Sequence, residues 1–185
     1  MKPAAGVAGL VALAWAGLAP GAPPPAEHFA FKGIELGSAI ADVASNPRFE
    51  CRTASAPAAD TICGLRPKET ETIAGAPVRS AFFFYFGGKL TSIAIHLEER
   101  NFAPVAEALR GKYGEASVKT EAIRNLKGVA FENRTYTWKT ATESLTAQRF
   151  AGRLDQSAIR YAADDLIRRI EARRAAVAKD PSKDL

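Results

Sequence analysis

The sequence predicts an α+β domain in which helices pack on one face of an antiparallel sheet. Strand-like runs at residues 78–86 and 89–97 flank Gly87-Gly88, which is typical of a two-residue hairpin turn. Further along, residues 102–113 carry apolar side chains at helical spacing. Several strands follow one another along the chain before a helix intervenes. This order favours the α+β class over a fold in which strands and helices alternate and the sheet is parallel.

The first 26 residues have the layout of a secretory signal peptide. Lys2 precedes an uncharged run at residues 4–19, and a Pro/Gly/Ala-rich stretch follows at residues 20–26. We therefore expect a periplasmic or secreted protein, with an uncleaved N-terminal anchor as the alternative. Residues 27–178 then form a single domain, and residues 179–185 form a frayed tail.

The N-terminal part of the domain is expected to contain short elements. Residues 29–36 favour an extended segment that ends at Gly37, and Ser38 is suited to cap a brief helix at residues 39–44. Residues 49–52 and 61–65 follow as two short strands joined by a loop rich in turn residues.

Two cysteines, Cys51 and Cys63, are the only ones in the chain. In an exported protein an even number of cysteines indicates a disulfide, so we expect these two to be bonded. The alternative is a redox-active pair, but such pairs use a close Cys-x-x-Cys spacing that the chain lacks here.

The Gly-Gly turn also predicts how the hairpin strands pair. Phe86 is expected opposite Lys89, which continues to Phe84 opposite Thr91 and Phe82 opposite Ile93. One face then contains the core side chains Val78, Phe82, Phe84, Phe86, Ile93, Ile95 and Leu97. The opposite face is mixed, and includes Arg79, Ala81, Phe83, Tyr85, Leu90, Ser92, Ala94 and His96.

This mixed face is the candidate functional surface. Apolar and aromatic side chains left exposed on a small soluble protein typically mark a partner surface. We therefore expect Arg79, Phe83, Tyr85 and His96 to bind a partner, unless a helix or loop covers them.

The second half of the chain predicts three further strands between two helices. Asn101 is suited to cap the helix at residues 102–113, which Gly114 ends. A polar connection follows, then strands at residues 131–139, 143–150 and 156–162. The closing helix, from about residue 163 to residue 178, has acidic residues first and arginines later, which suits the helix dipole.

No catalytic, metal or phosphate-binding motif is found in the sequence. Gly87-Gly88-Lys89 lacks the remainder of a phosphate loop, and no histidine or cysteine cluster offers zinc its ligands. Glu98 and Glu99 are adjacent on a strand, so they point to opposite faces and cannot act as an acid/base pair. We expect no enzyme activity and no cofactor. The net charge of +5 is too diffuse to indicate nucleic acid.

The chain resembles small uncharacterised exported proteins of Gram-negative bacteria. The motifs that carry the resemblance are Phe31-Lys32-Gly33-Ile34-x-Leu36-Gly37, Ile73-Ala74-Gly75-Ala76-Pro77, Gly88-Lys89-Leu90-x-Ser92-Ile93 and Lys112-Tyr113-Gly114. The layout is similar to the α/β modules of β-lactamase inhibitor proteins and of the small lipoprotein of the outer-membrane barrel-assembly machinery. These motifs are turns, caps and a hairpin, so the resemblance implies a fold and assigns no functional residue.

The resulting hypothesis is a non-enzymatic periplasmic binding or interaction module. Its partner would be an unidentified periplasmic or envelope protein, with no stable membrane span after signal cleavage. One alternative is a structural accessory of the cell envelope, whose basic last helix contacts anionic lipid or glycan. The other is an unrecognised hydrolase that assembles scattered polar groups.

Overall fold

The computed structural model describes residues 28–54 and 59–178. The expected signal peptide at residues 1–26 and the expected tail at residues 179–185 lie outside the described residues. Residues 55–58, which lie between the two cysteines in sequence, are also outside the described residues.

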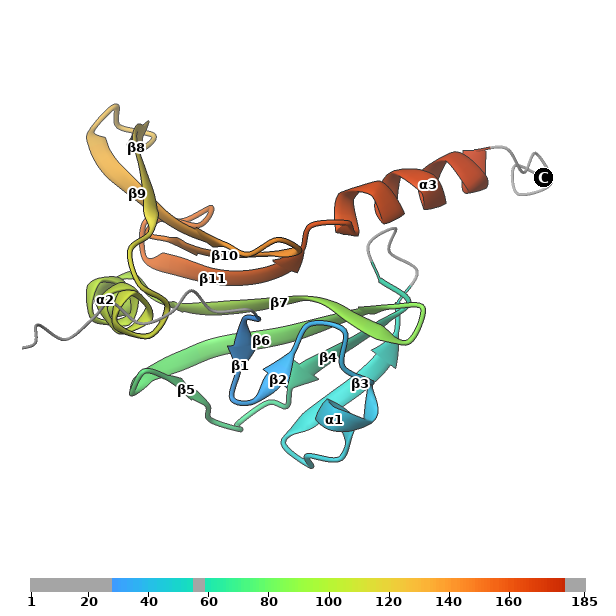
Figure 1. Ribbon diagram of the computed structural model, residues 1–185. Coiled ribbons are helices and arrows are strands. Elements are labelled where there is room, and N and C mark those ends of the chain that lie inside the picture. Colours follow the sequence, from blue (N-terminus) through green and yellow to red (C-terminus); the bar gives the residue numbers. More distant parts are fainter. Residues whose placement is uncertain (1–27, 55–58, 179–185) are drawn as a thin grey trace, which may run out of the picture.

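One antiparallel sheet dominates the fold (Figure 1). Its strands, in spatial order, are β3 (Phe49–Thr53), β4 (Thr61–Leu65), β6 (Ala76–Phe86), β7 (Lys89–Glu98), β11 (Gln156–Ala163), β10 (Glu143–Gln148), β9 (Ala130–Lys139) and β8 (Ser117–Arg124), with β5 (Thr72–Ile73) beside β6. The remaining elements are β1 (Ala30–Phe31), β2 (Ile34–Glu35), α1 (Ala41–Ala44), a 3₁₀ turn (Glu99–Asn101), α2 (Phe102–Tyr113) and α3 (Leu166–Ala178).

Two four-stranded meanders make up this sheet. Strands β3, β4, β6 and β7 follow α1, whereas β8 to β11 follow α2. The last strand of each meander pairs antiparallel with the last strand of the other, with Ile95 opposite Ile159 at the centre of the ladder. The two halves therefore share one continuous sheet.

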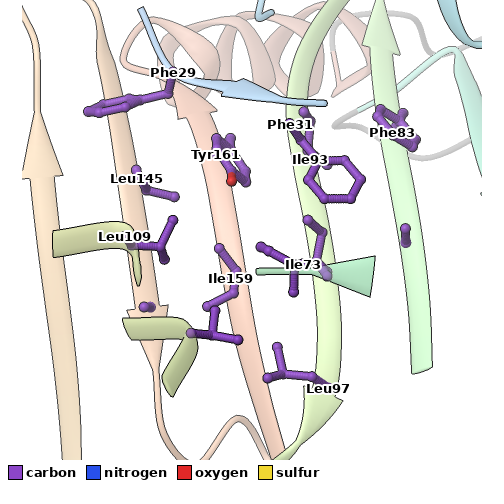
Figure 2. Packing of buried hydrophobic residues seen from close by; sticks show 14 of the residues in the cluster. Phe29, Phe31, Ile73, Phe83, Ile93, Leu97, Leu109, Leu145, Ile159 and Tyr161 are labelled. Atoms are coloured by element: carbon purple, nitrogen blue, oxygen red, sulfur yellow. The ribbon is translucent and has the colours of Figure 1, made fainter. Parts of the chain in front are cut away.

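The core lies on one face of the sheet, which we call the inner face (Figure 2). Strand residues buried there include Cys63, Ala81, Phe83, Tyr85, Ile93, Ile95, Leu97, Leu145, Ala147, Ile159 and Tyr161. Covering side chains come from α2, α1, β5 and the β1 region, among them Leu109, Val43, Ile73 and Phe31. Helices and an antiparallel sheet are both present, but the domain is richer in sheet than expected because short strands provide part of the cover.

The predicted register of the β6–β7 hairpin holds for the pairs next to the turn, Phe86 with Lys89 and Tyr85 with Leu90, and is wrong from Phe84 to Ser80. Phe86 does pair with Lys89, but Phe84 pairs with Ser92, which makes Thr91 an extra residue on β7. A second bulge, at Arg79 on β6, restores the original register at Val78. A shift of one residue moves every side chain of a strand to the other face. Consequently Ala81, Phe83 and Tyr85 are buried, while Phe82, Phe84 and Phe86 are partly exposed.

Three local expectations are also corrected. Residues 29–36 form the tight β1–β2 hairpin, with Lys32 and Gly33 at positive φ in its turn, instead of one extended segment. Ser38 does not cap α1, which makes no side-chain cap bond. The segment expected to be a polar connection contains β8, which pairs with β9 along its whole length.

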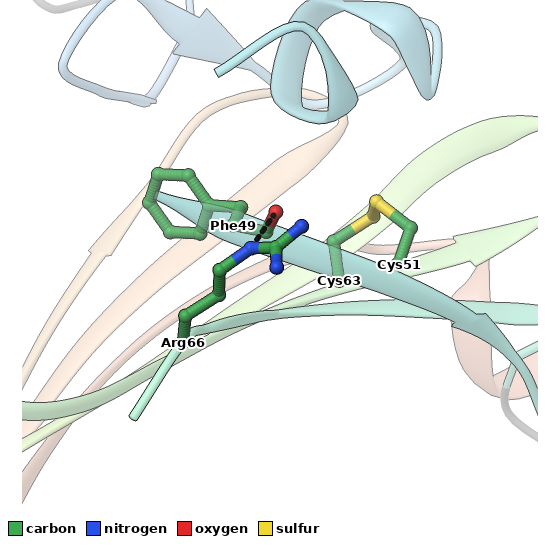
Figure 3. Close-up of a disulfide and its surroundings, with 4 residues drawn as sticks. All are labelled: Phe49, Cys51, Cys63 and Arg66. Carbon is green, nitrogen blue, oxygen red and sulfur yellow. Dashed lines mark hydrogen bonds between the residues drawn. A yellow bond between two sulfur atoms is a disulfide. The ribbon is translucent and has the colours of Figure 1, made fainter. Parts of the chain in front are cut away.

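The Cys51–Cys63 disulfide is present, with an S–S distance of 1.99 Å (Figure 3). The two residues oppose each other across the β3–β4 ladder, so the bond ties the edge strand to its neighbour. Cys63 is fully buried and Cys51 is partly exposed. A disulfide of this kind is typical of a non-reducing compartment.

Replacing Phe83 with alanine should lower the free energy of unfolding by about 3–5 kcal/mol, because the ring is fully buried. Phe84→Ala, its neighbour on the partly exposed face, should cost only about 1–2 kcal/mol. Urea unfolding of the two variants provides the comparison. An equal or reversed order would show that the strand has the unbulged register.

Replacing both cysteines with alanine should reduce stability by about 2–4 kcal/mol, since the bond closes a short loop in the unfolded chain. The far-ultraviolet circular dichroism should stay that of the wild type. In the wild-type protein, thiol titration under denaturing conditions without reductant should detect no free thiol. Two reactive thiols per chain would contradict the expectation.

Candidate functional site

The candidate site lies on the face of the sheet opposite the core, which we call the outer face. Phe82, Phe84 and Phe86 alternate along β6 with buried residues, so all three rings are on this side and partly exposed. We call them the phenylalanine row. The rings of Phe82 and Phe84 have their centroids 6.5 Å apart, with 49° between the ring planes.

Residues of the neighbouring strands flank the row, and three of the four that face Phe82 and Phe84 are small. Phe82 faces Gly64 on β4 and Ala94 on β7, while Phe84 faces Ile62 and Ser92. A Cβ atom on Gly64 would lie 3.2 Å from the Phe82 ring, which is tighter than an ordinary contact. The absence of a side chain at position 64 therefore allows the Phe82 ring to lie over β4.

A shallow hollow of about 250 Å³ borders the row beside Phe82. Arg52, Arg66 and Glu50 contribute its charged lining. On the other side of the row, Arg160 of β11 lies opposite Ala94 of β7, and Arg160 is exposed. Three arginines and one glutamate thus surround the phenylalanine row, which gives the apolar patch a positively charged border.

The four residues predicted to form a partner face do not form a common surface. Phe83 and Tyr85 are fully buried in the core, and Figure 2 shows Phe83 among the core residues. Burial, followed by the charge of Asp42, raises the pKa of the Tyr85 hydroxyl to about 12. The expectation of an exposed mixed face is therefore wrong, because the bulge at Thr91 reverses which side of β6 faces the core.

Arg79 and His96 are accessible, but they occupy different positions from those predicted. Arg79 is the bulged residue, and its guanidinium lies 3.4 Å from Asp155 and 3.5 Å from Glu98. His96 instead pairs with Ser80, whose hydroxyl is 3.0 Å from the histidine Nδ1. Burial, and then the charge of Arg160, lowers the pKa of His96, so the ring is neutral at pH 7.

The contact between Ser80 and His96 joins a potential nucleophile to a potential base. Nucleophilic catalysis also requires a third group that orients the base and a place for the substrate. No carboxylate among the described residues bonds to the His96 ring, and the hollow beside Phe82 is lined by neither residue. The arrangement supplies two parts of such a site.

Helix α3 contacts the sheet at the turn of the β6–β7 hairpin. It leaves the end of β11 and projects beyond the sheet (Figure 1). Arg173 bonds to Asp60 and places its guanidinium 5.2 Å from the centroid of the Phe86 ring. The N–H of Gly87, 2.7 Å from Asp60, and Arg173 together lower the pKa of the Asp60 carboxyl. The basic helix therefore reaches one end of the phenylalanine row.

An ionic cluster around the buried carboxylate of Glu71 was not predicted. Its carboxylate is 5% exposed, bonds to Lys32, and lies 3.2 Å from Arg48 and 2.8 Å from the N–H of Thr72. Burial alone raises the pKa of Glu71, but Lys32, the Thr72 N–H and Arg48 outweigh it and the net pKa is lowered. Lys32, Arg48 and Glu71 are far apart in sequence, so no local pattern could have predicted their ionic contacts.

The described residues contain neither a clustered set of metal ligands nor a membrane-spanning helix. No group of three or more histidine, cysteine or acidic side chains there is placed to hold a metal ion. Among residues 28–54 and 59–178, no helix has both the length and the apolar character needed to cross a bilayer.

Comparisons with known proteins identify no relative: no family model, curated protein or solved structure matches this chain.

Glu71→Gln should make unfolding less dependent on acid pH. Because the native pKa is lowered from 4.5, ionised Glu71 contributes stability above about pH 4.5, and this contribution is lost as the pH falls through the native pKa. At pH 7 the variant should be about 1–3 kcal/mol less stable than the wild type, because the donors from Lys32, Arg48 and Thr72 lose a charged acceptor. Between pH 7 and pH 3 its free energy of unfolding should fall less than that of the wild type.

The matched control is Glu69→Gln, because Glu69 also meets Arg48, at 3.5 Å, but is exposed. That change should stay within about 0.5 kcal/mol at pH 7. Urea unfolding at several pH values measures both variants. A Glu71→Gln curve parallel to that of the wild type would contradict the role of the cluster.

Proposed function

We propose that this chain is an exported, non-enzymatic binding module that holds a protein partner on the outer face of its sheet. The observation that supports this most directly is the partly exposed phenylalanine row between arginine side chains. Aromatic and arginine side chains are enriched among residues that contribute most to protein–protein binding. An apolar patch with a polar border is also the usual anatomy of such an interface.

The charges around the row specify the kind of partner. Arg52, Arg66 and Arg160 outnumber Glu50, so a partner with acidic side chains around an apolar centre fits best. The shallow hollow beside Phe82 would take an apolar side chain of this partner. His96 is neutral at pH 7 and would add no charge to this contact.

The disulfide and the expected signal peptide support the cell compartment that we propose. Both favour a periplasmic or secreted location, in which the partner is an envelope or secreted protein. The resemblance to β-lactamase inhibitor and barrel-assembly modules, which rests on sequence motifs, concerns the fold and assigns no functional residue. That resemblance remains part of the proposal.

A second candidate function is a structural accessory of the cell envelope. It is favoured by the position of α3, which projects from the domain and carries Arg168 and Arg169 on exposed positions. Such a helix could contact anionic lipid or glycan. Arg169 is partly neutralised by Asp165 at 2.5 Å, and Arg173 by Asp60, so fewer charges remain for a membrane than the sequence suggests. A hydrolase built on Ser80 and His96 has less support, since the orienting group is missing.

A photo-crosslinking residue in place of Phe84 should capture one protein partner in cells that export the chain. The same residue in place of Glu107, an exposed position on α2, is the control and should not capture it. With that partner purified, Arg160→Glu should weaken binding about tenfold or more and leave the melting temperature within 2–3 °C of the wild type, as roughly expected for a surface change.

Two outcomes would count against this function. Equal capture from positions 84 and 107 would show that the outer face is not selective. Binding to anionic liposomes that falls as salt rises, together with no capture at position 84, would favour the envelope accessory.

A further inference from the structure

The β8–β9 hairpin is the most exposed part of the described sheet and stands away from the core (Figure 1). Among the described residues, the large apolar side chains that are exposed all lie on it: Val118 at 52%, Leu126 at 108% and Val129 at 52%. Strand β8 pairs only with β9 and forms one edge of the sheet. A long exposed edge is a template for pairing with another strand.

The backbone groups available on this edge can be identified. Asn125 donates its N–H to the carbonyl of Val129, and the β8–β9 register has no shift. Because hydrogen-bonded pairs alternate in an antiparallel ladder, odd-numbered residues of β8 bond to β9. The N–H and C=O groups of Val118, Thr120 and Ala122 therefore face away from the sheet.

At the opposite edge of the sheet, β3 has a backbone carbonyl that already accepts a hydrogen bond from a side chain, which is not the case for β8 among the described residues. The carbonyl of Phe49 accepts a hydrogen bond from Arg66 Nε at 3.2 Å, and Cys51 is held by the disulfide (Figure 3). A side chain that bonds to edge backbone groups blocks the addition of a strand there. On β8, Lys119 and Glu121 bond to each other, 2.5 Å apart, and leave the backbone edge open.

We propose that β8 pairs antiparallel with β8 of a second copy of this chain, about a two-fold axis at Thr120. The even-numbered residues of β8, whose N–H and C=O groups face away from the sheet, must lie opposite even-numbered residues of the second copy. The two residue numbers of every facing pair therefore add up to an even number. Centring the axis on Lys119 or on Glu121 would place like charges opposite each other, which is unfavourable. Centring it on Thr120 places Lys119 of each copy opposite Glu121 of the other.

The same register covers apolar surface. Val118 of each copy faces Ala122 of the other, and Thr120 faces itself. Lys119 and Glu121 then belong to the closely spaced, non-hydrogen-bonded pairs, where cross-strand side chains approach most closely. The two sheets become one continuous sheet, and the contact is isologous, as a two-fold dimer requires. This dimer does not depend on the phenylalanine row, which lies at the other end of the sheet.

Charge reversal tests the pairing by sedimentation equilibrium. The wild-type protein should show a reversible monomer–dimer equilibrium. Lys119→Glu and Glu121→Lys should each weaken it about tenfold or more, because each replaces two attractive pairs with two repulsive ones. An equimolar mixture of these two variants should form a one-to-one heterodimer, and the double variant with both changes should dimerise like the wild type.

The control is Glu107→Lys, the same charge change on the exposed face of α2, which should leave the dimer unaffected. Circular dichroism and melting temperature verify that all variants fold. A wild-type chain that is monomeric at every concentration up to about 1 mM, or single variants that dimerise as well as the wild type, would overturn the proposal. The proposal would also be overturned if an equimolar mixture of folded Lys119→Glu and Glu121→Lys variants remained monomeric.

A cysteine crosslink tests the position of the axis. Facing residues in hydrogen-bonded pairs have Cα atoms about 5.5 Å apart, within the range of a disulfide. Thr120→Cys should therefore give a covalent dimer on mild oxidation. Val118→Cys should not, because in this register its equivalent in the second copy is four residues further along, about 13 Å away. Efficient crosslinking at position 118 and none at 120 would contradict this register.

Discussion

The ladder between β7 and β11 is the interaction on which the whole domain depends. Each four-stranded meander alone would leave one of these strands as an unpaired edge and only half of the inner face covered. Their pairing places Ile95 beside Ile159, Ile93 beside Tyr161 and Leu97 beside Ser157, all buried. The ladder therefore produces both the continuous sheet and the single core, because the buried side chains of the two halves meet along it.

Apart from α2, the cover over this core consists of short segments that polar contacts hold in place. The buried carboxylate of Glu143 accepts the N–H of Phe29 at 2.7 Å and lies 3.0 Å from the His28 ring. Tyr113 donates its hydroxyl to the carbonyl of Ala30, and Glu71 anchors the β1–β2 turn through Lys32. Segments of two to four residues cannot bury enough apolar surface to stay in place alone, so these bonds contribute directly to the closure of the core.

The two bulges in the β6–β7 hairpin connect the fold with the candidate binding face. Strand β7 keeps Ile93, Ile95 and Leu97 inside, as its alternation predicts. Strand β6, however, has an aromatic side chain at every position from 82 to 86, so either of its faces could serve as the core. The bulge at Thr91 selects the face with Phe83 and Tyr85, and as a direct result the phenylalanine row lies on the outer face. The proposed partner surface is thus a consequence of the packing of Phe83 and Tyr85 in the core.

The sequence by itself determined the local elements with strong signals. The Gly-Gly turn with its two strands, the helix that begins at Phe102, and the pairing of Cys51 with Cys63 depend on turn chemistry, periodicity and cysteine number, all of which are properties of neighbouring residues or of composition. Strand β8 has solvent on both faces and therefore no hydrophobic alternation, so that only its hydrogen bonds to β9 make it a strand. The register of β6, the Glu71 cluster and the open β8 edge were decided by tertiary structure, because each depends on which distant segment supplies the partner for burial or hydrogen bonding.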